Sequence, residues 1–164
     1  MNKITLIGDS IFDNGTYVSP GEPDVTQQVK GLLDDGDTVT RLAVDGDITS
    51  GVERQLRGIP DGATHLFISV GGNDALGYLH LFERPVPNIG AALIEFYEVM
   101  NAFESEYVTM LNKVIKYGLH TTLCTIYHPY FEHESSERIM DVMSTGIEFS
   151  TLQKKADRHS YFCM

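Results

Sequence analysis

Apolar residues fall into short runs that are separated by polar turns and by amphipathic stretches. Four of these runs are rich in β-branched residues and end at glycine, polar or proline-containing turns, which predicts strands buried in a parallel sheet. They are residues 3–7, 38–44, 65–70 and 121–127, and residues 160–164 have the pattern of the start of a fifth strand. The runs therefore predict a mainly buried β-sheet.

Helical spacing of apolar residues fills most of the gaps between the strands. The predicted helices are residues 23–33, a short helix near 50–59, residues 89–117 and residues 135–158, while 71–88 is expected to be a loop. Strands that alternate with helices indicate right-handed crossovers. We therefore expect residues 1–164 to form one three-layer α/β domain.

Details of three predicted helices can be tested against a structure. Pro23 suits the first position of a helix, and Ser50 with Glu53 has the spacing of a capping box. The short helix is expected to bury Val52, Leu56 and Ile59. The long helix is expected to bury one stripe. The stripe comprises Leu93, Tyr97, Met100, Tyr107, Leu111, Val114 and Ile115.

Composition limits the partners of the chain. The net charge of −11 and a pI near 4.8 disfavour binding to nucleic acids and to anionic membranes. The chain starts in a strand without a signal peptide, and it has no apolar run long enough to span a membrane. Cys124 and Cys163 have no CxxC spacing, so we expect buried, reduced thiols in a cytoplasmic protein.

Three predicted strands are followed by residues that suit acyl transfer. Ser10 follows the first strand, Gly46 the second and Asn73 the third. In an open parallel sheet these ends share the edge where ligands bind. A lone serine after a strand is as readily explained as a turn or helix cap. Together, however, the N–H groups of Ser10 and Gly46 and the Asn73 amide could stabilise an oxyanion.

The motifs also resemble a known family. Residues 6–14 look like the first block of the SGNH, or GDSL, hydrolases, and 71–74 look like the third block. Asp45-Gly46 falls where the second block has its glycine, and residues 125–130 are similar to the family's Tyr-Asn-Pro segment, with His128 where asparagine is usual. The resemblance implies a flavodoxin-like sheet of order 2-1-3-4-5. It also implies ester or thioester hydrolysis without a cofactor, with Ser10 as nucleophile and Gly46 and Asn73 in the oxyanion hole.

One block of the family pattern is missing. The family supplies its base from an Asp-x-x-His block after the fifth strand, and no such block occurs near residue 164. Asp157-Arg158-His159 has the wrong spacing. Either the chain stops before that block, or another histidine replaces it, with His128 a better substitute than His159. A serine without a base is a poor nucleophile, so we expect impaired activity. An incomplete sheet would also favour self-association.

Two other readings remain open. The same sheet edge could hold a phosphate or nucleotide, or it could bind an acyl or glycan group without cleaving it. No P-loop or dinucleotide motif is present, and the loops are acidic, which disfavours an anionic ligand. The histidines have no metal-ligand spacing. Asp9 and Asp13 are expected to brace the Ser10 loop. The expected partner is therefore a small-molecule ester.

Overall fold

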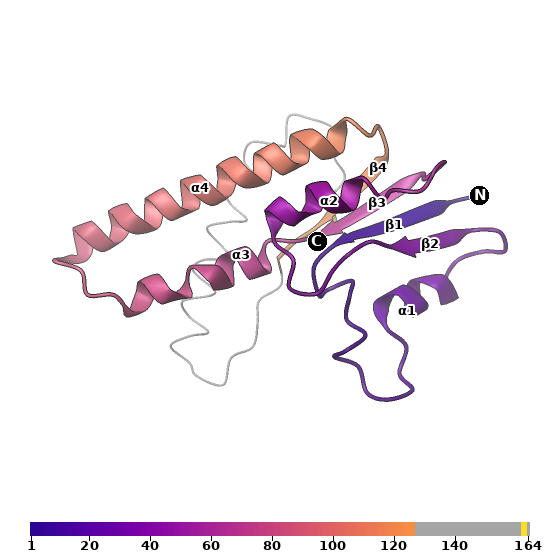
Figure 1. The fold of residues 1–164 in the computed structure, drawn as a ribbon, viewed down its shortest axis with the longest axis horizontal. Helices are drawn as coiled ribbons and strands as arrows, with labels where there is room; N and C mark the ends of the chain where they lie inside the picture. The colour runs from indigo at the N-terminus through magenta and orange to yellow at the C-terminus, as the bar shows by residue number, and fades with distance from the viewer. Residues whose placement is uncertain (127–161, 164) are drawn as a thin grey trace.

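The structure, a computed structural model, describes residues 1–126 together with residues 162 and 163. Its centre is a parallel sheet with the strand order β2-β1-β3-β4-β5 (Figure 1). The strands are β1 (Lys3–Gly8), β2 (Thr38–Arg41), β3 (His65–Ser69), β4 (His120–Cys124) and β5 (Phe162–Cys163). Both the predicted α/β class and the predicted order are confirmed.

The strand register brings the strand ends together. Gly8 of β1 pairs with Ser69 of β3, and both are the last residues of their strands. Leu6 and Ile7 are buried because β1 has a hydrogen-bonded strand on each side and packs on both faces. Since the strands are parallel, the loops after β1, β2 and β3 leave from the same edge of the sheet, which we call the carboxyl edge.

Helices cover both faces of the sheet (Figure 1). The larger apolar cluster contains Val52 and Leu56 of α2 (Val52–Leu56) and Tyr107 of α4 (Ile89–Ile115). On the other face, Val25 of α1 (Val25–Gly31) packs against the cluster of Leu6, Phe12 and Ala43. Two apolar clusters on opposite faces give the three layers that the sequence predicted.

The beginnings of two helices differ from the prediction. Pro23 lies outside α1, because Asp24 is the N-cap and forms a capping box with Gln27. Ser50 caps nothing and instead lies inside a 3-10 helix, η1 (Thr49–Gly51). The nearby Thr49 N–H donates at 3.0 Å to the carboxylate of Asp74, which lies in the first turn of another helix, α3 (Gly72–Gly77). A tertiary contact therefore replaces the predicted local cap.

The segment predicted as a loop is partly helical. α3 (Gly72–Gly77) starts directly after β3, and the 3-10 helix η2 (Leu79–Glu83) follows it. Together with the first half of α4, these elements form an arm that projects past the sheet, here called the helical hairpin (Figure 1). Leu93 and Tyr97 on this arm are 62% and 67% exposed, and Ile115 at the end of α4 is also exposed. Of the predicted stripe, Tyr107, Leu111 and Val114 are therefore buried, and Met100 is half-buried.

Other boundaries follow from hydrogen bonding. β2 ends at Arg41 rather than at residue 44 because Leu42 N and Ala43 N both donate to the Leu6 carbonyl, which interrupts the ladder.

Cys124 is half-buried rather than buried. Within the described residues, no helix is long and apolar enough to cross a bilayer. The helix predicted at 135–158 lies outside the described residues, as do His128 and His159.

Candidate active site

Ser10 sits in a tight helical turn after β1. The carbonyl of Asp9 accepts hydrogen bonds from Phe12 N at 3.2 Å and Asp13 N at 3.1 Å, and the Asp9 carboxylate accepts one from Ile11 N at 3.1 Å. These bonds leave Ser10 half-buried at the start of the turn. Among the described residues, its N–H and hydroxyl have no hydrogen-bond partner. Within the described part of the chain, both groups are therefore open to a ligand.

A buried glutamine holds the strand end that precedes this turn. Gln55 of α2 is 4% exposed, and its Oε1 accepts from Gly8 N at 2.7 Å while its Nε2 donates to the Gly8 carbonyl at 2.8 Å. Nε2 also donates to Asp47 Oδ2 at 2.6 Å. Nothing local in the sequence marks Gln55 as a site residue, because its partners Gly8 and Asp47 lie elsewhere along the chain. It connects the loop after β1 with the loop after β2.

Gly46 occupies a turn of residues 44–47, closed by a bond of 3.1 Å from Asp47 N to the Val44 carbonyl. Its φ of +78° is a conformation that residues with a Cβ rarely adopt. A Cβ at this position would have nothing within 4 Å, so the space beside the glycine is open. Its N–H has no acceptor among the described residues. The turn thus presents an unpaired donor at the carboxyl edge.

Asn73 lies in the first turn of α3 and contacts the loop of Gly46 directly. Its Nδ2 donates to the backbone carbonyl of Asp47 at 2.9 Å, which leaves one hydrogen of the amide for another acceptor. The Asp47 carboxylate binds Gln55, which in turn binds Gly8. The loops that carry Ser10, Gly46 and Asn73 are therefore joined by one continuous set of hydrogen bonds.

The expectation that Asp13 braces the Ser10 loop is confirmed. Its Oδ2 accepts from Asp45 N at 2.9 Å, and its Oδ1 forms an ion pair of 2.6 Å with Arg41 Nη1. The hydroxyl of Tyr17 lies 3.0 Å from the Asp45 carboxylate. These contacts fix the loop after β1 against the loop after β2. The carboxylates of Asp13 and Asp45 are thus already bound within the protein.

Comparisons with known proteins identify the fold. No protein-family model matches the chain, and no curated protein matches it. A lipase from a goat rumen metagenome is 19% identical with a TM-score of 0.68, over 99% of this chain and 80% of that one. A lipolytic protein of the G-D-S-L family from Veillonella parvula is 14% identical with a TM-score of 0.64, over 99% and 76%. An acetylxylan esterase from Geobacillus stearothermophilus is 19% identical with a TM-score of 0.61, over 99% and 75%.

The chain has an SGNH/GDSL hydrolase-like fold. At these identities the likeness concerns the fold alone, and it assigns no role to Ser10, Gly46 or Asn73. The lipase and the acetylxylan esterase act on very different esters according to their names. The SGNH/GDSL fold therefore does not by itself select a substrate.

Two of the described histidines lie away from the carboxyl edge of this SGNH/GDSL fold. His65 and His120 are the first residues of β3 and β4, so they lie at the opposite edge, where their rings stack 5.3 Å apart. His80 lies on the helical hairpin, with Nδ1 2.8 Å from the Gly77 carbonyl. Neither His65 nor His120 is therefore placed to accept a proton from Ser10. The candidates His128 and His159 lie outside the described residues.

A buried carboxyl group, Asp9, and a half-buried one, Asp74, follow β1 and β3 near the candidate site. Asp9 is 3% exposed, and burial raises its pKa to about 6; nearby Asp74 and Asp45 add to the rise, whereas the bond from Ile11 N opposes it. Burial also raises the pKa of Asp74, and Glu106 contributes. Among the described residues, no group of His, Cys, Asp and Glu could hold a metal ion. The site therefore disfavours anions such as phosphate.

The raised pKa of Asp9 predicts a pH-dependent stability. Because the folded protein binds this proton more tightly than the unfolded chain, the contribution of Asp9 to stability is full below pH 4 and declines as the pH rises to about 6. The Asp9→Asn substitution should therefore change the free energy of unfolding more favourably at pH 8 than at pH 4. The difference between its effects at the two pH values should be about 2–3 kcal/mol. Urea unfolding of both proteins at the two pH values measures this.

Asp37→Asn is the matched control. Asp37 is exposed, and hydrogen bonds from the backbone and side chain of Asn2 lower its pKa, so its contribution to stability is present at neutral pH and declines on acidification. The control should therefore lose stability at pH 8 and approach wild type at low pH. An Asp9→Asn effect of equal size at pH 4 and pH 8 would contradict the raised pKa.

Proposed function

We propose that this protein is a serine ester hydrolase that acts on a small-molecule ester. Ser10 is the nucleophile, and its N–H, the Gly46 N–H and the Asn73 amide are the donors for the oxyanion. The observation that carries the proposal is the continuous hydrogen-bond linkage between the three loops, from Gly8 through Gln55 and Asp47 to Asn73. Preorganised donors of this kind are the largest single contribution to many acyl-transfer reactions.

The chemistry proceeds in two steps. In the first, the Ser10 oxygen bonds to the ester carbonyl carbon while its proton passes to a base, and collapse of the intermediate breaks the bond to the alcohol, which takes the proton. In the second, water attacks the acyl-serine, releases the carboxylic acid and restores the Ser10 hydroxyl. The two N–H groups and the Asn73 amide hold the carbonyl oxygen in both steps.

The base in this scheme is an imidazole from outside the described residues. His65 and His120 lie at the opposite edge of the sheet, and Nδ1 of His80 lies 2.8 Å from the Gly77 carbonyl. His128 and His159 are the candidates weighed from the sequence. A serine site without its base retains an acceleration of only about 10³–10⁴ over water from the oxyanion hole and binding. We therefore propose that the rate of this chain depends on which imidazole reaches Ser10.

A fluorophosphonate probe tests the proposal, because it reacts only with an activated serine. We expect the full chain to be labelled at Ser10, located by peptide mass spectrometry, and Ser10→Ala to remain unlabelled. Ser50→Ala is the matched control, since Ser50 is an exposed serine of η1 that is not part of the proposed site. Labelling that is absent, or that persists in Ser10→Ala, would overturn the proposal.

The position of the described histidines favours one second candidate, a domain that binds an acyl or glycan ester without cleaving it. In that case the fluorophosphonate leaves Ser10 unmodified, yet an uncleaved ester still binds. Equilibrium binding to wild type and to Asn73→Ala distinguishes this candidate from an inactive site, because the bound ester would lose the donor that the Asn73 amide offers.

A further inference from the structure

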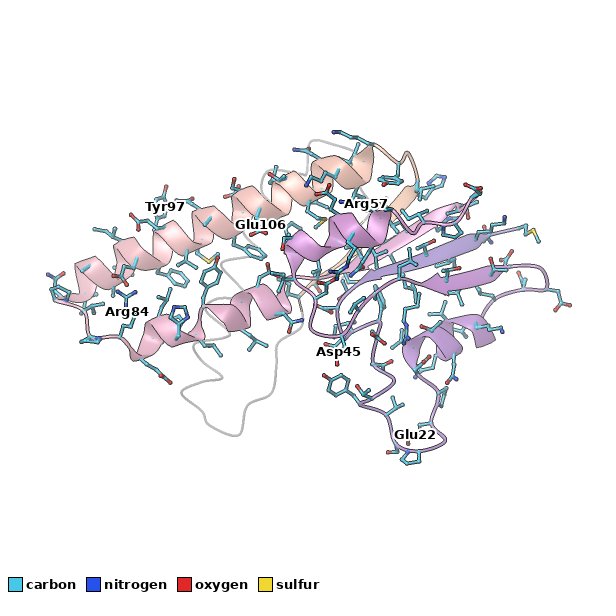
Figure 2. All side chains as sticks on the ribbon, viewed as in Figure 1. Glu22, Asp45, Arg57, Arg84, Tyr97 and Glu106 are labelled. Atoms are coloured by element: carbon cyan, nitrogen blue, oxygen red, sulfur yellow. The ribbon has the colours of Figure 1, made fainter. Side chains whose placement is uncertain are left out.

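The helical hairpin encloses a cavity of about 160 Å³ between η2 and the first half of α4. Its lining is mostly apolar and aromatic. The apolar lining includes Tyr78, Leu81, Phe82, Ala92, Phe96 and Val99. Arg84, which is labelled in Figure 2, also lines the cavity, as does Glu95. Arg84 Nη2 lies 3.8 Å from Glu95 Oε1, so the two charges offset one another. The cavity therefore suits an uncharged, apolar ligand.

Several large apolar side chains of the helical hairpin are exposed to solvent. Phe82 and Val86, both at the cavity, are 43% and 38% exposed, and Leu76 of α3 is 38% exposed. Exposed apolar side chains that gather around a concave site indicate a ligand rather than ordinary surface. They also continue along α3, toward the candidate active site.

α3 connects the cavity to the candidate active site. The helix has six residues, with Asn73 in its first turn and Tyr78 as its C-cap, so it spans about 9 Å. Tyr78 lines the cavity, and its pKa is raised by burial and by the charges of Glu106 and Asp74. Asp74 in turn binds Thr49 of η1. One short helix thus separates the proposed oxyanion donor from the cavity.

We propose that the cavity holds the end of the hydrocarbon chain of the acyl group, which runs from Ser10 along α3. This inference rests on the proposed function and selects its substrate class: esters of medium-chain fatty acids rather than acetyl esters. An acetyl group is far shorter than α3 and cannot reach the cavity, whereas an octanoyl or decanoyl chain can. Burying each additional methylene in an apolar pocket favours the longer ester.

Filling the cavity tests the proposal through chain-length dependence. In Ala92→Phe the added ring takes up the space of the chain, so kcat/KM for 4-nitrophenyl octanoate should fall at least about tenfold, while that for 4-nitrophenyl acetate stays unchanged. Ala102→Phe is the matched control, since Ala102 is an exposed position of the same helix outside the cavity lining. An equal fall for both esters, or none for either, would overturn the proposal.

Binding gives a readout that needs no catalysis. We expect 1-octanol to raise the Tm of the Ser10→Ala variant and to leave that of Ser10→Ala/Ala92→Phe unchanged. If wild type cleaves no ester but octanol binds in this pattern, the proposed function fails and the cavity assignment stands. If octanol raises the Tm of neither variant, or of both equally, the cavity assignment fails whatever the activity.

Discussion

A Gly8→Ala variant is expected to lose at least about 4 kcal/mol of its free energy of unfolding. A Cβ at residue 8 would lie 1.7 Å from the carbonyl oxygen of Ser69 and 2.6 Å from its carbonyl carbon. These are backbone atoms of the neighbouring strand, and the same oxygen accepts the hydrogen bond from Asp9 N. The strand cannot move aside without breaking the sheet at the edge that carries Ser10.

Gly21→Ala separates this clash from the effect of backbone conformation. Gly21 also has a positive φ, +91°, but a Cβ there would meet nothing within 4 Å. Its alanine variant should therefore lose only the cost of the left-handed conformation, about 1 kcal/mol. Urea unfolding measures both variants against wild type. If Gly8→Ala is as stable as Gly21→Ala, the close approach of β1 and β3 described here is wrong.

The second large effect is expected for Gln55→Leu, about 2–3 kcal/mol of lost stability. Leucine fills a similar volume but leaves the buried N–H of Gly8 without its acceptor and removes one of the two donors to the Gly8 carbonyl, which keeps its bond from Val44 N. Each stranded polar group costs about 1–3 kcal/mol. Gln28→Leu is the control, because Gln28 is exposed and donates one bond, to the Pro23 carbonyl; we expect a change within about 0.5 kcal/mol.

For Gln55→Glu we expect a loss of stability that depends on pH, which a simple packing defect would not give. An ionised glutamate still accepts from Gly8 N, but it cannot donate to the Gly8 carbonyl and it faces the Asp47 carboxylate. Protonation restores a donor, so the loss of stability should be smaller at pH 4 than at pH 8. A deficit that does not change with pH would exclude this account of the glutamine.

The sheet and its edge could be predicted because their signals are local. β1 and β3 each have a strand on both sides, so their residues form near-continuous apolar runs that stand out in the sequence. The glycines and polar residues after these runs mark the points where the chain leaves the sheet. This places Ser10, Gly46 and Asn73 at one edge without any knowledge of side-chain contacts.

The parts that could not be predicted depend on distant partners. Gln55 is one polar residue in a short helix, and its importance comes from Gly8, 47 positions earlier. The apolar stripe of α4 has helical spacing throughout, but spacing does not say where the sheet beneath it ends, so Leu93 and Tyr97 were expected to be buried. α3 is too short for a clear periodic signal.

Asp47 serves the site through two chemically distinct parts. Its main-chain oxygen receives the Asn73 amide, and its carboxylate receives Gln55 and Arg54. Any amino acid supplies a main-chain oxygen, so the hydrogen bond that anchors Asn73 tolerates substitution of Asp47. The bond from Gln55 to this loop, in contrast, needs a side-chain acceptor at position 47. A fold whose loops are held largely by main-chain groups can keep its shape while side chains change, and this chain shares its fold with structures to which it is only 14–19% identical.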